Sequence, residues 1–155
     1  MFIKAPSGRK RLNVLGALDA ITHRLIMVTN DSYINSDSVC ELLVKIMECS
    51  TGIPITVVLD NTRYQKCQKV RELAERIGIE LLFLPTYSPN LNLIERVWKF
   101  VKRKCLYSKY YEKFTDFKSA ITECLEKSDT VHKEELATLL TPNFQTFKKV
   151  HIVVG

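Results

Sequence analysis

The sequence predicts an α/β fold, and two apolar runs with the segment between them are the main reason. The runs 55–59 and 79–84 are continuously or almost continuously apolar, and they stop at Asp60 and Pro85. Runs of this kind are typical of strands that are covered on both faces of a sheet. The segment between them has the apolar spacing of a helix, so the two strands are expected to be parallel, with a right-handed crossover.

The residues before the first run predict a strand pair followed by a helix. Segments 12–20 and 24–29 are short and apolar or β-branched, and residues 19–23 would connect them. Residues 36–48 place their apolar side chains on one helical face, with Ser36 as the candidate N-cap. This part of the chain therefore adds two strands and one helix to the α/β unit.

The same periodicity predicts four further helices, at 66–77, 93–105, 116–127 and 132–140. Gly78 follows the first of them, where glycine is favoured, and Thr115 is the candidate cap of the third. The tail that ends in VHIVVG is assigned no element. No repeat, linker or low-complexity segment divides the chain, so residues 1–155 are expected to form a single domain.

The composition is that of an average globular domain, with 155 residues, 46% hydrophobic and 26% charged. No apolar run approaches the ~20 residues that span a bilayer, and the N-terminus has no apolar stretch of the signal-peptide kind. A cytoplasmic location without a membrane partner is expected. The cysteines form no close pair, which predicts reduced thiols rather than a zinc site or disulfides; they are Cys40, Cys49, Cys67, Cys105 and Cys124.

Positive charge is concentrated in one part of the chain. The net charge is +6, and residues 96–118 hold eight basic residues against Glu112 and Asp116. Aromatic residues lie between these bases, as on surfaces that follow the phosphates of nucleic acids. A solvated basic helix face is the alternative. The candidate DNA-binding residues are Arg96, Lys99, Lys102, Arg103 and Lys104.

Two carboxylates are candidates for catalysis and metal binding. Asp60 follows a predicted strand, and ligands of open α/β sheets bind beyond such strand ends. It could instead form a turn with Asn61. Glu95 lies at the edge of the buried face of the predicted helix 93–105, where a carboxylate needs a cation or another partner. A capping box with Asn92 is the alternative for Glu95.

The two acids together carry more information than either alone, because 34 residues separate them. Their flanking strings, VLDNTRYQ and LPTYSPNLNLIERVWK, resemble the second and third acidic motifs of mariner-superfamily transposases of the bacterial and archaeal insertion-sequence type. GRKRLNVLGALDAITHRL also resembles the second and third strands of that catalytic domain. The resemblance covers about 8–121 and leaves 122–155 as a C-terminal helical extension.

The resemblance implies an RNase H-like fold, the integrase-like catalytic core, in which three carboxylates hold two Mg²⁺ or Mn²⁺ ions. Such enzymes cut transposon ends and join them to target DNA. Asp60 matches the second acid and Glu95 the third, and both would bind metal. Trp98 matches an aromatic packing position. The implied partners are DNA and either a second copy or a full-length transposase.

The first acid of the family has no counterpart at the matching place. Residues 1–11 contain no Asp or Glu, and neither a first strand nor a helix-turn-helix region precedes the strand at 12–20. Asp19 is a candidate substitute, or simply a hairpin-turn residue. Because two metal ions would then be under-neutralised, the chain alone is expected to be inactive or severely impaired. Gln65 also stands where the family commonly has His.

The missing first strand has a structural consequence, since in the family it lies between the second strand and the strand that bears the second acid. Either 12–20 pairs directly with 55–59, or a gap exposes strand edges and solubility is marginal. A non-catalytic DNA-binding or assembly fragment that uses 96–118 is the alternative function. A phosphotransferase with an Asp nucleophile is a weaker one, because its second Asp would be replaced by Thr62.

Overall fold

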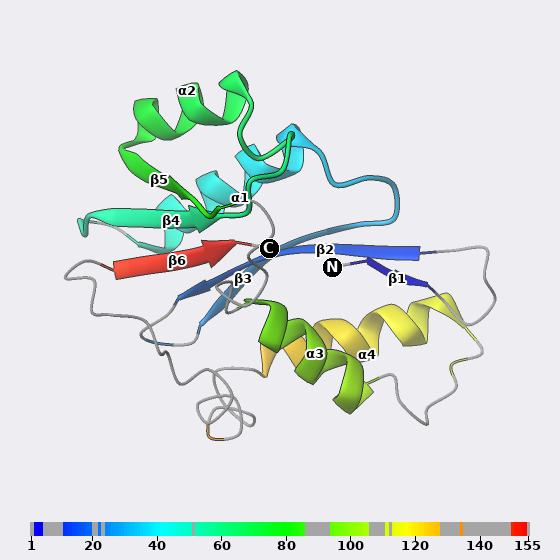
Figure 1. The fold of residues 1–155 in the computed structure, drawn as a ribbon. Coiled ribbons are helices and arrows are strands. Elements are labelled where there is room, and N and C mark those ends of the chain that lie inside the picture. The colour runs from blue at the N-terminus through cyan, green and yellow to red at the C-terminus, as the bar shows by residue number, and fades with distance from the viewer. Residues whose placement is uncertain are drawn as a thin grey trace.

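The computed structural model describes residues 2–4, 11–19, 22, 24–50, 52–85, 94–105, 111, 113–127, 134 and 150–154. Within these ranges the chain forms six strands and four helices (Figure 1). They are β1 (Phe2–Lys4), β2 (Arg11–Asp19), β3 (Leu25–Asn30), α1 (Ser36–Cys49), β4 (Ile55–Leu59), α2 (Gln68–Ile77), β5 (Ile79–Phe83), α3 (Ile94–Cys105), α4 (Phe114–Glu126) and β6 (Val150–Val154).

All six strands belong to one mixed sheet with the order β1-β2-β6-β4-β5, and β3 also pairs with β2. β4 and β5 are parallel, with Ile55 level with Ile79, which confirms the expected strand–helix–strand unit. β2 and β3 are antiparallel, which confirms the expected strand pair. The α/β fold class is therefore correct.

The largest difference from the sequence-based expectation is β6. This strand lies between β2 and β4, antiparallel to β2 and parallel to β4 (Figure 1). Both expectations for this place, direct pairing of β2 with β4 and an open gap, are therefore wrong. Residues 150–154 are also a strand rather than part of a helical extension. Without β6, backbone N–H and C=O groups on the facing edges of β2 and β4 would be unpaired. Pairing with a further strand satisfies these groups, which favours the insertion of β6.

β1 was also not expected, because no strand was predicted before residue 12. It pairs with the first three residues of β2, with Phe2 level with Asn13. Two residues of β2 have a partner strand on each side. Asn13 is paired with both β1 and β3, and Ala17 is paired with both β3 and β6. A strand has two edges, so β3 occupies one edge of β2 while β1 and β6 share the other.

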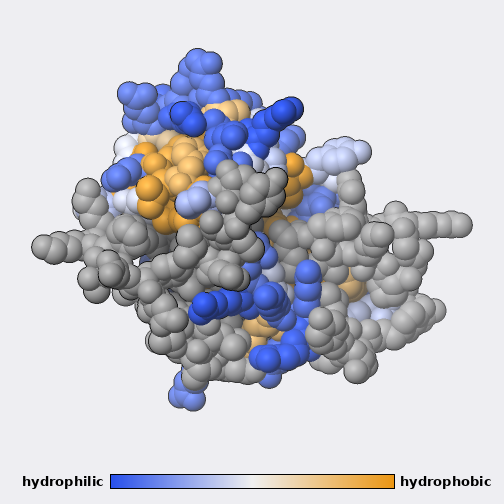
Figure 2. Space-filling view, viewed as in Figure 1, coloured by the Kyte–Doolittle hydropathy of each residue, from blue (hydrophilic) through white to orange (hydrophobic). Residues whose placement is uncertain are grey.

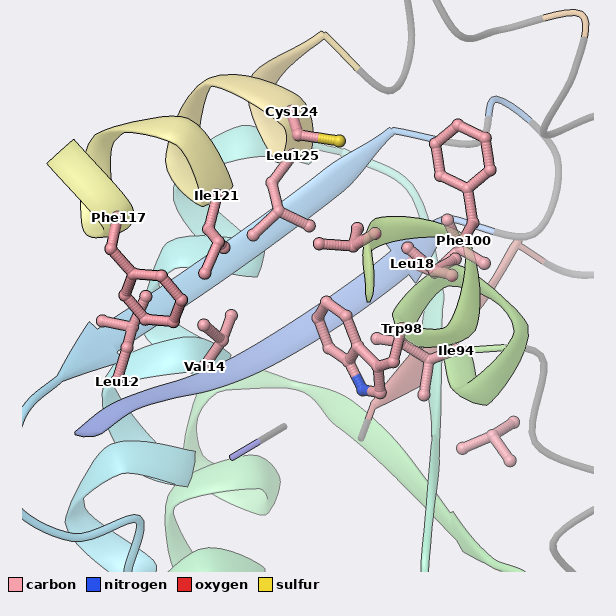
Figure 3. Packing of buried hydrophobic residues seen from close by; sticks show 13 residues of the cluster. Leu12, Val14, Leu18, Ile94, Trp98, Phe100, Phe117, Ile121, Cys124 and Leu125 are labelled. Carbon is pink, nitrogen blue, oxygen red and sulfur yellow. The ribbon is translucent and has the colours of Figure 1, made fainter. Parts of the chain in front are cut away.

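The sheet has a core on each face. On β2, alternate residues point to opposite faces, as strand geometry requires. The α3/α4 core contains Leu12, Val14, Leu18, Val58, Ile94, Val97, Trp98, Phe100, Val101, Phe117, Ile121, Cys124 and Leu125 (Figure 3). The α1/α2 core contains Leu15, Ala17, Val28, Val39, Leu42, Leu43, Ile46, Ile55, Val57, Leu59, Val70, Ala74 and Ile79.

Helix ends differ from expectation where local hydrogen bonding decides them. Asn35, not Ser36, caps α1, and its side chain accepts hydrogen bonds from the backbone N–H groups of Asp37 and Ser38. α2 begins at Gln68 rather than at residue 66, and α4 begins at Phe114, so Thr115 lies inside that helix and is not its cap. Gly78 ends α2 with a φ of 81°, the left-handed conformation that favours glycine.

The sequence predicted that β5 is covered on both faces, and this prediction is wrong. α2 covers one face of this edge strand, and Glu80 and Leu82 are exposed on the other. The helix predicted at 132–140 lies outside the described residues except for Glu134, which is helical. No helix in the described ranges combines the length and the apolar character needed to cross a membrane.

Candidate functional site

Asp60 lies directly after the last residue of β4, at an anchored strand end. All five residues of β4 are buried, and the N–H of Leu84 donates a hydrogen bond of 2.8 Å to the carbonyl of Leu59. Val58 points into the α3/α4 core, so strand alternation carried on by two residues directs Asp60 to the same face. The carboxylate is half-buried, at the border between core and solvent.

The turn after Asp60 is built around the carbonyl of Thr62. It accepts hydrogen bonds from the N–H groups of Gln65, at 3.2 Å, and Lys66, at 3.1 Å. Gln65 is only 1% exposed, and its side-chain oxygen has no hydrogen-bond partner in the described part of the chain. Gln65 is thus buried at this turn, at a position where the resemblance to transposases implied a histidine.

The negative charge of Asp60 affects the pKa of Tyr64. Burial raises the pKa of its phenol above the usual value, and the negative charge of Asp60 acts in the same direction. Both effects disfavour a second negative charge beside the carboxylate. Tyr64 was not singled out from the sequence, where an aromatic residue four positions after an acid carries no recognisable signal.

Glu95 lies in the first turn of α3, and its carboxylate is half-buried. The positive end of the helix dipole stabilises an anion at this position. The residue before it, Ile94, is fully buried and shares the α3/α4 core with Val58 of β4. Asp60 and Glu95 therefore border the same core cluster. The alternative capping partner Asn92 lies outside the described residues.

Trp98 fixes the position of α3 on the sheet through a close approach to Gly16. Its ring reaches from α3 to β2, and it is 3% exposed (Figure 3). A Cβ atom at position 16 would lie 2.5 Å from Cη2 and 2.8 Å from Cζ2 of Trp98. The absence of a side chain at Gly16 thus leaves room for the Trp98 ring. Trp98 has the expected packing role, and this packing also orients the helix that carries Glu95. An isolated glycine within a strand can signal such an approach.

The basic residues of α3 lie mostly on one side of the helix. At about 100° per residue, Arg96, Lys99, Lys102 and Arg103 fall with Glu95 within about one third of the helix circumference. This basic arc, defined by those four residues, is half-buried or exposed, and Figure 2 shows hydrophilic side chains over α3. Lys104 lies outside the arc, with its ammonium 5.8 Å from the ring centroid of Phe100.

The sheet face beside α3 is only partly covered. β5 has its outward residues Glu80 and Leu82 on the face to which Asp60 is directed, and the Leu82 side chain is 41% exposed. Figure 2 shows apolar side chains gathered on the side of β4 and β5, above the hydrophilic area of α3. The two candidate acids therefore border an accessible surface with an apolar part and a basic part.

Asp19 is not brought to the same place. It is the last residue of β2, and its carboxylate accepts a 3.0 Å hydrogen bond from the N–H of Thr22. The register sets Asp19 level with Ile152 and Val57, which is three residues before Asp60. Three residues along the strands correspond to about 10 Å, and the two strand spacings from β2 to β4 add about 10 Å in the perpendicular direction. Asp19 is therefore separated from Asp60 in both directions. This placement favours the hairpin-turn role.

The described donors fit a two-metal site incompletely. No group of three or more His, Cys, Asp or Glu side chains in the described ranges could hold a metal ion. β6, which lies next to β4, contains no acidic residue. Asp60 and Glu95 are two candidate carboxylates, and the neighbouring strand β6 adds no third.

A separate cavity of about 380 Å³ lies between α1 and α2, lined by Cys40, Lys69, Glu72, Leu73 and Arg76. Lys69 forms an ion pair with Asp37 of α1 beside it. Burial raises the pKa of the Cys40 thiol, which keeps it protonated at neutral pH. This cavity belongs to the α1/α2 face and contains neither candidate acid.

Comparison with known proteins places the chain in a family and a fold. Residues 2–118 match the protein family described as DDE superfamily endonuclease. The catalytic domain of Mos1 transposase, in a structure with raltegravir and Mg, superposes with a TM-score of 0.65 at 13% identity, covering 96% of this chain and 82% of that one. No curated protein matches the chain in sequence.

Two retroviral structures share the same architecture. The catalytic core domain of BIV integrase has a TM-score of 0.60 at 13% identity and covers 84% of this chain and 81% of its own. A chain of the simian T-cell lymphotropic virus intasome, solved with the PP2A regulatory subunit B56 gamma, has a TM-score of 0.54 at 14% identity, covering 96% and 49%. The fold is therefore the RNase H-like fold of integrase and transposase catalytic cores.

Proposed function

Because the chain belongs to the DDE superfamily endonuclease family, we propose that it is a transposase catalytic domain of the bacterial or archaeal insertion-sequence type. Asp60 and Glu95 are the metal-binding carboxylates in this proposal, and Mg²⁺ or Mn²⁺ are the ions. The DNA partners are transposon ends and target DNA, bound in the cytoplasm by a homodimer or by a complex with full-length transposase.

One observation supports the proposal: the strand that ends before Asp60 and the helix that bears Glu95 both contribute residues to the same core cluster. Val58 lies two residues before Asp60 and Ile94 one residue before Glu95, and both are buried in the α3/α4 core. The basic arc of α3 continues from Glu95 along the accessible surface. An acidic pair beside a basic helix face suits a phosphodiester, whose charge the metal ions and the arc would both neutralise.

A direct test is lanthanide binding, because Tb³⁺ prefers oxygen ligands and is excited through nearby indole rings. Trp98, the single tryptophan, lies one helical turn after Glu95. We expect Tb³⁺ luminescence on excitation of Trp98, and a loss of affinity of about tenfold or more in Asp60→Asn and in Glu95→Gln. Glu72→Gln on α2 is the matched control and should bind as the parent does. Equal affinity in all four proteins would contradict the metal site.

Cleavage is tested separately from metal binding. Two carboxylates leave two metal ions under-neutralised, so the chain by itself is expected to nick supercoiled DNA weakly or not at all with Mg²⁺ or Mn²⁺. Cleavage that Asp60→Asn abolishes would overturn this expectation and would show that a third ligand is present in the folded chain.

The second candidate function is non-catalytic DNA binding or assembly, which the basic arc favours. In fluorescence anisotropy with a duplex of arbitrary sequence, affinity should fall steeply with salt. Lys99→Gln and Lys102→Gln should each lower the salt slope by about one, whereas Lys104→Gln, outside the arc, should change it less. DNA affinity that persists unchanged in Asp60→Asn/Glu95→Gln, together with no metal binding by the parent, would favour this candidate over the first.

A further inference from the structure

The turn that follows Asp60 contains two buried side-chain oxygens that lack a hydrogen-bond donor. They are Oγ1 of Thr62 and Oε1 of Gln65, and no group in the described part of the chain donates to either of them. Gln65 is only 1% exposed, so its amide oxygen is out of reach of bulk solvent. A buried acceptor without a donor costs free energy, and most such groups in native proteins are paired with protein or with an ordered water molecule.

The neighbouring donors are already used. The backbone N–H groups of Gln65 and Lys66 both donate to the carbonyl of Thr62, and the thiol of Cys67 donates to the carbonyl of Tyr64 over 3.4 Å. The Thr62 hydroxyl lies beside the Tyr64 phenol, whose pKa burial raises and this hydroxyl lowers. A hydroxyl has that effect when it acts as a donor, so its oxygen still lacks a donor of its own.

One small molecule can reach both oxygens. Thr62 and Gln65 are the first and last residues of a turn that a 3.2 Å hydrogen bond closes, and such turns bring the two Cα atoms to within about 7 Å. A water molecule that donates to two oxygens at about 2.8 Å each can join acceptors that are up to about 5.5 Å apart. The shared turn therefore allows a single molecule to satisfy both side chains.

From these observations we infer that the turn after Asp60 binds one buried water molecule, which donates its two protons to Oγ1 of Thr62 and Oε1 of Gln65. A hard cation fits less well, because such ions take about six or more oxygen ligands. The carbonyl of Thr62 already accepts two hydrogen bonds, which use both of its lone pairs. Two neutral oxygens instead match a buried water, which needs about two to four polar partners.

The bound water joins the two ends of the turn that supports Asp60. Thr62 lies two residues after this acid, and Gln65 lies three residues before Gln68, where α2 begins. The bridge therefore holds the connection between β4 and α2 in one arrangement. The inference does not rest on the proposed function, because neither oxygen binds metal in that proposal.

The first measurement is the nuclear Overhauser effect between water and the methyl protons of Thr62. We expect a cross-peak of the sign that identifies a long-lived bound water, and its loss in Gln65→Met, which keeps the length of the side chain and removes the oxygen. Thr56 is the matched control, because it is also buried and its hydroxyl pairs with Glu80 at 3.4 Å. A Thr62 cross-peak no larger than that of Thr56, or one that persists in Gln65→Met, would overturn the inference.

A double-mutant cycle in urea unfolding provides the second measurement. Thr62→Val and Gln65→Met each deprive the water of one acceptor, so each should lower the folding equilibrium constant about tenfold. The double variant removes both oxygens and should cost no more than either single change, which corresponds to a coupling of about tenfold. Costs that simply multiply would contradict the bridge. Thr56→Val combined with Gln65→Met is the control cycle and should show no coupling.

The identity of the bound molecule is tested with salts. At one ionic strength, the parent chain should have the same stability in sodium chloride, potassium chloride and choline chloride, because water and not a cation occupies the site. Higher stability in one of the alkali salts, lost in Gln65→Met, would assign the site to that cation and overturn the assignment to water.

Discussion

The two faces of the sheet are built differently. The α1/α2 core draws on Leu15 to Ile79, with its helices and strands following one another along the chain. The α3/α4 core joins β2, one residue of β4 and two helices far along the chain, and it contains Trp98 and two buried phenylalanines. Asp60, Glu95 and the basic arc all adjoin this second core. One face therefore serves packing, whereas the other also positions the candidate site.

The largest effect on stability is expected when one large side chain is truncated in each core, and the two variants distinguish the two faces of the sheet. Trp98→Ala should lower the free energy of unfolding by about 3–5 kcal/mol, and Leu42→Ala by about 2–5 kcal/mol. Urea unfolding followed by far-UV circular dichroism measures both. Trp98→Ala should also weaken Mn²⁺ binding, because α3 loses its anchor on the sheet, whereas Leu42→Ala should leave it unchanged. Equal effects on Mn²⁺ affinity would remove the functional difference between the faces.

A smaller effect is expected from filling the space at Gly16. Gly16→Ala places a methyl group against the Trp98 ring and should cost about 1–3 kcal/mol of stability through overpacking. Because the clash involves atoms Cη2 and Cζ2, Trp98→Phe should relieve it. A double-mutant cycle between the two substitutions measures the coupling. Purely additive costs would show that the ring and the strand are not in close contact.

On the packing face, the cap of α1 gives an effect of about 1 kcal/mol. Asn35→Ala removes the acceptor of the two first-turn N–H groups and should destabilise the chain by that amount. Ser36→Ala, at the position expected from sequence, should change stability by less than about 0.5 kcal/mol. Thermal or urea unfolding distinguishes the two variants, and the reverse order would restore Ser36 as the cap.

The smallest effect is a change in titration beside the candidate site. Folding raises the pKa of Tyr64, so the folded chain holds the phenol proton more tightly than the unfolded chain. This contribution to stability is complete below the ordinary pKa of 10.0 and is lost as the pH rises above it.

Asp60→Asn should lower the pKa of Tyr64 without restoring its ordinary value, because burial remains. Ultraviolet titration, with Tyr64→Phe as the reference that identifies this phenol, measures the change. An unchanged pKa would place the Asp60 carboxylate away from Tyr64.

The elements around the candidate acids were predictable because their signals are local. β4 lies at the expected residues, and the helix that bears Glu95 ends where expected. A continuous apolar run and a 3.6-residue periodicity are both properties of a short segment. The cap of α1 and the start of α4 were misplaced because several polar residues compete at a helix end, and backbone geometry chooses among them.

The sequence by itself determined that β4 and α3 form, and it placed Asp60 and Glu95 at the ends of these two elements. Tertiary structure alone decided that β6 enters the sheet between β2 and β4, that Gly16 receives Trp98, and that Asp19 stays apart from Asp60. The reason is physical: local pattern specifies an element, whereas strand pairing depends on which distant backbone edges remain to be satisfied.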